Sequence, residues 1–197
     1  NKDNSFDVEL PKKIKNGSEI SVSVDDIGIS FELLENVNSV KGDVEQCKSI
    51  ETKSVDEGEL NAVASNENSS SVTYADVLEN TDIIYSVKPT ELKENVVLKS
   101  QPVGGYSVSY KINTTGLSAL LRDDNSVEMT DSNDEVRFTL PAPFMYDSQN
   151  AVSYDVSVTL EQADGGYILT YTPNGEWLAD ASRVYPITVD PVVKVQS

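Results

Sequence analysis

The chain has 197 residues, of which 38% are hydrophobic and 24% charged, so it can bury a core and is not a disordered tail. Its 33 acidic and 15 basic residues give a formal net charge of −18, which repels phosphate backbones and anionic lipid headgroups. We therefore expect no nucleic-acid partner and no membrane insertion, and the absence of histidine excludes catalytic triads and zinc sites built on that residue.

Two runs of alternating apolar and polar residues lie near the start of the chain. Residues 19–24, EISVSV, and residues 27–33, IGISFEL, place an apolar side chain at every second position, which is typical of half-buried antiparallel strands. Cys47 is the only cysteine, so an internal disulfide is excluded, and we expect it to pack as a small apolar residue. No signal peptide is visible and the chain starts abruptly at Asn1, so we expect a piece of a longer protein.

The next segment, residues 55–71, is poorer in pattern, and its Asn/Ser-rich end is the best linker candidate. We expect a single β-sandwich body over 1–197. An internal division near 66–71 is the alternative, with N-terminal strands over 1–65 and a second β-rich region over 72–193. Directly after this segment, YADVLEN (residues 74–80) predicts one or two helical turns.

The alternation returns in the second half of the chain. The strands that it predicts cover residues 106–113, 127–129, 136–140, 154–161 and 167–171. Turn sequences such as RDDNS, DSNDE and ADGG separate them. Many short strands at regular spacing predict an all-β fold, an antiparallel two-sheet β-sandwich that could be large and extended.

Several tyrosines occupy the same alternate positions as the apolar residues of the predicted strands. The five that do so are Tyr85, Tyr106, Tyr110, Tyr154 and Tyr171. We expect them in the core or at its rim, although exposed tyrosines could stack on sugars. In LPAPFMYDS (residues 140–148), two prolines direct the chain out of the sheet, where the aromatic residues fill apolar space or form a recognition ridge.

Acidic turns supply the only metal candidates. Asp131, Asn133 and Glu135 occupy alternate positions, as oxygen ligands of calcium often do. The spacing of an EF-hand is missing, so ordinary hairpin turns are the favoured interpretation and calcium is a weak candidate. We expect no other cofactor.

Lysines beside strands raise a covalent alternative. A lysine–asparagine or lysine–aspartate isopeptide bond needs a buried lysine, and Lys88, Lys93 and Lys111 lie in or next to predicted strands. Lys111 is expected to face outward, which counts against it. The sequence leaves the presence of such a bond open.

The segment EWLADASRVYPITVDP (residues 176–191) predicts a short turn followed by a closing strand. We expect Trp177 to cap one end of the core and Arg183 to pair with a carboxylate. Tyr185 precedes Pro186, a pair that can adopt the cis form, and Asp190 ends the strand before Pro191. These residues are interpreted as structural, with a ligand role for Trp177 or Arg183 as the alternative.

Four phrases between residues 71 and 191 occur in a fixed order: LKENVVL, LPAPFMYDS, WL and RVYPITVDP. Together they resemble a β-rich region that precedes DNRLRE-type modules in wall-associated and YD-repeat (Rhs-like) secreted proteins of Gram-positive bacteria. Residues 1–70 match more loosely. The resemblance implies an extracellular location, secreted or cell-wall associated, a long parent chain and no catalytic residue to carry over.

We therefore expect a non-catalytic structural or spacer module of a large bacterial cell-surface or secreted protein, and not an enzyme. Its partners would be neighbouring modules of the same polypeptide. The alternative is an adhesion module that binds glycans or a host surface protein. A carboxylate-based hydrolase is less favoured, because no spacing singles out two acids in a cleft.

Overall fold

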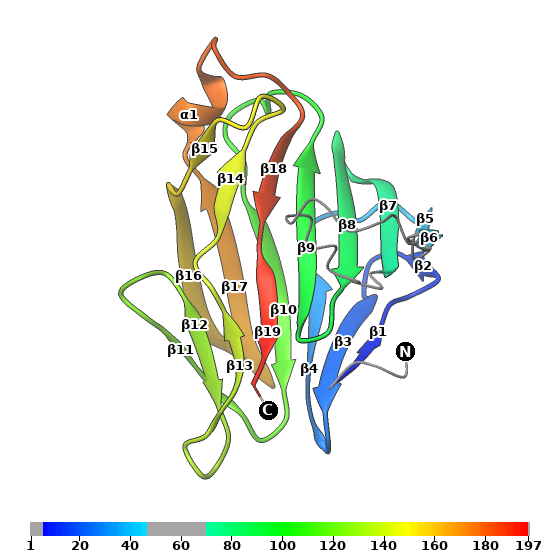
Figure 1. The fold of residues 1–197 in the computed structure, drawn as a ribbon, viewed down its shortest axis with the longest axis vertical. Coiled ribbons are helices and arrows are strands. Elements are labelled where there is room, and N and C mark those ends of the chain that lie inside the picture. Colours follow the sequence, from blue (N-terminus) through cyan, green and yellow to red (C-terminus); the bar gives the residue numbers. More distant parts are fainter. Residues whose placement is uncertain (1–5, 47–69, 197) are drawn as a thin grey trace, which may run out of the picture.

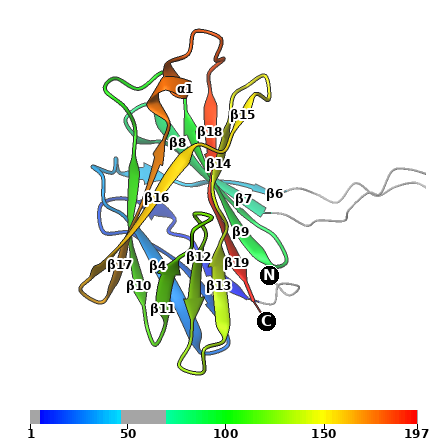
Figure 2. The same ribbon diagram turned by 90° about the vertical axis from the view of Figure 1, so that its left-hand side faces the viewer.

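Most of the strands consist of alternating apolar and polar residues. The strands form two antiparallel sheets that pack face to face (Figures 1 and 2). The computed structural model describes residues 6–46 and 70–196. The predicted fold class, an all-β antiparallel sandwich, is confirmed. Cys47 and most of the pattern-poor segment, including residues 66–69 of the linker candidate, lie outside the described residues.

The smaller sheet has six strands. In spatial order they are β1 (Asp7–Glu9), β3 (Glu19–Val24), β4 (Ile27–Leu33), β10 (Val108–Thr114), β17 (Gly166–Pro173) and β16 (Val156–Ala163). The runs EISVSV and IGISFEL form the hairpin of β3 and β4, and β4 then pairs with β10. The ADGG turn joins β16 to β17, as its residue types predict.

The larger sheet is organised around β9 (Glu91–Leu98). β8 (Thr81–Val87) pairs along one side of it, while β18 (Ile187–Asp190) and β19 (Val192–Val195) follow one another along the other side. The remaining strands of this sheet are β6 (Asp43–Gln46), β7 (Ser70–Leu78), β11 (Ser118–Leu121), β12 (Val127–Thr130), β13 (Val136–Leu140), β14 (Phe144–Tyr146) and β15 (Val152–Ser153). A separate ladder joins β2 (Lys13–Ile14) to β5 (Val40–Lys41).

The core lies between the two sheets. Phe31 and Leu169 enter it from the smaller sheet, and Leu92 and Val96 from the larger one, each at most 8% exposed. Strands from both sides of the undescribed segment share sheets, because β4 pairs with β10 and β6 pairs with β7. The single-body interpretation and the alternative division near 66–71 stay predictions.

The structure differs from the sequence pattern at several positions. YADVLEN continues β7 and does not form helical turns: a bulge with Asp76 at φ +54° lets both Val77 and Leu78 be buried. Tyr154 is 79% exposed, because β16 begins only at Val156. After leaving β13, the chain returns to the same sheet, where β14 pairs with β18.

The single helix of the described ranges is α1 (Gly175–Ala179). No helix within those ranges is long and apolar enough to cross a membrane.

Candidate functional site

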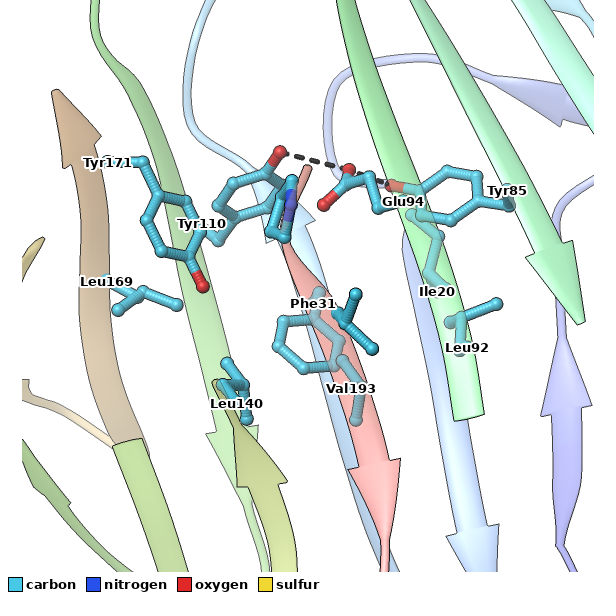
Figure 3. A pocket seen from close by; sticks show the side chains of 12 residues that line it. Ile20, Phe31, Tyr85, Leu92, Glu94, Tyr110, Leu140, Leu169, Tyr171 and Val193 are labelled. Atoms are coloured by element: carbon cyan, nitrogen blue, oxygen red, sulfur yellow. Dashed lines mark hydrogen bonds between the residues drawn. The ribbon is translucent and has the colours of Figure 1, made fainter. Parts of the chain in front are cut away.

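Glu94 is a carboxylic acid held between the two sheets (Figure 3). In β9 it lies in phase with Leu92 and Val96, so the alternation that builds the strand turns it inward. The hydroxyl of Tyr85 on β8 donates to Glu94 Oε1 at 2.7 Å, and that of Tyr110 on β10 donates to the same oxygen at 3.0 Å. One carboxylate oxygen thus connects strands from both sheets.

Burial controls the protonation of this cluster. Desolvation raises the pKa of Glu94 to about 7, although the hydrogen bonds from Tyr85 and Tyr110 act in the opposite direction. Burial, and then the charge of Glu94, raise the pKa of the Tyr110 hydroxyl well above 10. Among the described residues that line the cavity, none is a lysine or an arginine. Glu94 can therefore hold or release a proton near neutral pH without a cationic partner.

The space around Glu94 limits its chemistry. The cavity has a volume of about 20 Å³, and Tyr171 and Leu140 close part of it. A cavity of that size holds about one water molecule. Glu94 can exchange a proton with a water there, but a nucleotide or a sugar ring does not fit.

The sequence of β9 itself carries a signal for this site. Glu94 alternates with Leu92, Val96 and Leu98, which places one acid on an otherwise apolar face. The tyrosine pattern did predict buried positions for Tyr85, Tyr110 and Tyr171, and all three are at most 3% exposed. Tyr106 lies in a loop before β10 and is partly exposed.

The structure brings four of the five structural candidates together in one place, here called the C-terminal clasp: Trp177, Arg183, Tyr185 and Pro186. The Asn174 side chain accepts a hydrogen bond from the Trp177 amide at 2.9 Å and caps α1. The Arg183 guanidinium carbon lies 4.7 Å from the centre of the half-buried Trp177 ring, within cation–π range.

Asp147 anchors the clasp, although the sequence did not single it out. It is 2% exposed, and its carboxylate accepts hydrogen bonds from the amides of Gln149, Ala151 and Val184 at 2.9 to 3.2 Å. Arg183 Nη1 lies 3.6 Å from Asp147 Oδ2. Desolvation acts to raise the pKa of Asp147, but these amides and Arg183 outweigh it and the pKa is lowered.

Two further contacts close the clasp. The Tyr185 hydroxyl donates to the Leu178 carbonyl oxygen at 2.9 Å, and the Ser148 hydroxyl donates to the Pro186 carbonyl oxygen at 3.0 Å. The Tyr185–Pro186 peptide bond is cis. The contacts are of the kind that a structural role requires, and that role remains a prediction.

Asp190 lies apart from the clasp. It is 3% exposed and forms an ion pair with Lys93, whose Nζ is 2.7 Å from Asp190 Oδ2. Lys88 pairs with Glu91 at 2.9 Å, and Lys111 is partly exposed on β10. The question of an isopeptide bond stays open for these lysines.

The acidic turn at residues 131–135 is held by its own hydrogen bonds. Asp131 Oδ1 accepts from the amides of Asn133 and Glu135 at 2.8 and 3.2 Å. Arg137 Nη1 lies 3.7 Å from carboxylate oxygens of both Asp131 and Glu135, where a cation would have to bind. Within the described ranges, no group of three or more histidine, cysteine, aspartate or glutamate side chains is placed to hold a metal ion. Calcium binding stays a prediction, and Arg137 is a physical reason against it.

Comparison with curated proteins finds three relatives that are 34% identical to this chain over 130 residues. They are the tRNA nuclease WapA of Bacillus subtilis strain 168, the tRNA3(Ser)-specific nuclease WapA of Bacillus spizizenii and the tRNA(Glu)-specific nuclease WapA of Bacillus subtilis subsp. natto. The aligned region is 62% of this chain but only 6% of each relative. No family model and no solved structure matches the chain.

These relatives correct the functional expectations. The similarity is to proteins named as tRNA nucleases, and not to a region that precedes DNRLRE-type or YD-repeat modules. Those names describe enzymes that act on nucleic acid. The expectations of a non-enzymatic spacer, an adhesion module or a carboxylate hydrolase, and of no nucleic-acid partner, are therefore wrong. They failed because charge and histidine content describe this chain alone, whereas the names describe far longer proteins.

Proposed function

We propose that this chain is part of a tRNA nuclease, an enzyme whose substrate is nucleic acid. The observation that carries the proposal is the 34% identity over 130 residues to three proteins named as tRNA nucleases. Since the chain spans 6% of their length, the activity is proposed for the whole protein to which the chain belongs. In its broad form, the expected location outside the cell or in the cell wall is supported by the same relatives.

The charge of this chain sets a condition on how such a protein meets its substrate. A formal net charge of −18 repels the tRNA backbone, since affinity for nucleic acid comes mainly from neutralised phosphates. We infer that tRNA approaches this part of the protein only where divalent cations or basic segments of the same protein offset the charge. Binding should then depend steeply on salt and on magnesium.

The test is a cleavage assay on total tRNA with the full-length protein that contains this chain. We expect discrete tRNA fragments on a denaturing gel. Intact tRNA under all magnesium and salt conditions would overturn the proposal. The isolated 197-residue chain serves as a second arm. Cleavage by it would locate the chemistry within this chain.

A further inference from the structure

The loop between β9 and β10 crosses from one sheet to the other (Figure 1). Residues of this loop line a cleft of about 550 Å³. Its walls come from three stretches of chain: residues 35–36 after β4, residues 78–81 around the turn between β7 and β8, and residues between 98 and 107. Clefts of this volume are typical of sites for small organic molecules. It is separate from the small cavity around Glu94.

Two side chains in the cleft wall have unmet hydrogen-bonding capacity. Glu35 Oε1 accepts the Ser109 amide at 2.7 Å, but Glu35 Oε2 is shielded from solvent and has no hydrogen-bond partner within the described ranges. The same holds for the Tyr106 hydroxyl. The Thr81 hydroxyl is close enough to Tyr106 to lower the pKa of its hydroxyl, but Thr81 donates to the Glu79 carbonyl oxygen at 3.0 Å, so it does not serve as a donor to Tyr106. Shielded polar atoms are normally paired, so Glu35 Oε2 has room for a donor, and the Tyr106 hydroxyl can accept a hydrogen bond from the same donor.

The charge of the cleft selects the kind of donor. Glu35 and Glu79 line it, and no lysine or arginine does so among the described residues. Lys99, next to the wall, is already paired with Asp76 and Asp82 at 2.7 and 2.8 Å. Anions are therefore repelled and a cationic donor is favoured, since hydrogen bonds between ionised groups are the stronger ones.

Apolar surface continues the wall beside these acids. Leu78 and Leu98 line the cleft together with the Tyr106 ring. Such a surface suits an aliphatic chain attached to the cation. Desolvation raises the pKa of Glu35, and a cation placed against its carboxylate would oppose that shift.

We propose that this cleft binds a primary ammonium group on an aliphatic chain, with the ammonium donating to Glu35 Oε2 and the Tyr106 hydroxyl. The alkyl part lies against Leu78 and Leu98. Both polar atoms are shielded from solvent, so binding requires a side-chain rotation that exposes them to the cleft. The ammonium belongs either to a free amine or to a lysine side chain. This inference is independent of the proposed nuclease activity.

The experiment is an amide NMR titration of the 197-residue chain at pH 8, where alkylamines are still protonated. The probes are n-butylamine, n-butanol as its uncharged analogue, and Nα-acetyl-lysine methylamide. We expect butylamine and the lysine derivative to shift amide signals of Asn80 and of residues 98–107, and butanol to shift them much less. The lysine derivative binding about tenfold more tightly than butylamine would identify a protein side chain as the source, and equal affinity would identify any alkylamine.

Variants make the test specific. Glu35→Gln keeps an oxygen for the Ser109 amide but removes the charge, so binding should weaken by about tenfold or more. Tyr106→Phe removes only the hydroxyl and should weaken binding several-fold. Glu161→Gln removes one exposed negative charge on β16 and should change nothing. Butanol binding as well as butylamine overturns the proposal, as does unchanged affinity in Tyr106→Phe and Glu35→Gln.

Discussion

Glu94 makes the stability of the fold depend on pH. Its pKa is about 7 in the folded chain and near 4.5 in an unfolded one, so the folded state binds more protons between these pH values. Stability from this residue is present at low pH and is lost as the pH rises from about 4.5 through about 7. The loss amounts to at most about 3 kcal/mol in the free energy of unfolding.

Urea unfolding of the wild type and Glu94→Gln across this pH range tests the effect. The variant cannot ionise, so the wild type should lose stability relative to it by up to about 3 kcal/mol between pH 4.5 and pH 8. Subtracting the two curves removes other titrating groups, such as Glu35 and Asp190, whose pKa values are also raised. Glu161→Gln, at an exposed site, should run parallel to the wild type. Parallel curves for Glu94→Gln would contradict the proposed protonation.

At the scale of elements, the hairpin of β16 and β17 depends on Gly166, the first residue of β17. A Cβ atom at Gly166 would lie 1.9 Å from the Ile112 carbonyl oxygen, a backbone atom of the neighbouring β10. The backbone of β10 or β17 must move to admit it, and overpacking of this kind costs about 1–3 kcal/mol. The close approach of β10 and β17 therefore requires glycine here.

Gly166→Ala and Gly175→Ala form a matched pair for this prediction. At Gly175, the first residue of α1, an added Cβ meets nothing within 4 Å. We expect urea unfolding to show a loss of about 1–3 kcal/mol for Gly166→Ala, and a change below about 1 kcal/mol for Gly175→Ala. Equal effects of the two substitutions would mean that the β10–β17 contact is not the cause.

At the scale of the whole molecule, the local pattern of apolar residues predicted the strands. It did not predict which strands pair or how the two sheets pack. Period-two alternation was sufficient for β3 and β4, where nearly every second residue is buried. It failed at Tyr154, since alternation does not mark where a strand begins. Glu94 and its two tyrosines come from β8, β9 and β10, and their convergence depends on how the sheets stack. The partnership of Asp147 with Arg183, 36 residues later, is likewise set by the pairing of β14 with β18.

The pairing of distant strands also predicts how the chain responds to a cut. A specific protease site inserted between Asn66 and Ser69 would separate β1 to β6 from the later strands. Five residue pairs join β4 to β10 and four join β6 to β7, and Phe31 is buried between the sheets. The two fragments should therefore elute together from a size-exclusion column at the volume of the uncut chain, and separate in urea.

Phe31→Asp supplies the control for that cut. An unpaired carboxylate in place of the Phe31 ring is costly to bury, so the cut variant should release its N-terminal fragment without denaturant. Separate elution of the unsubstituted fragments would instead place a domain boundary near 66–71, and the β4–β10 and β6–β7 ladders would then be too weak to hold the two parts together. Co-elution would mean that the strands before the cut complete the same sandwich that encloses Glu94.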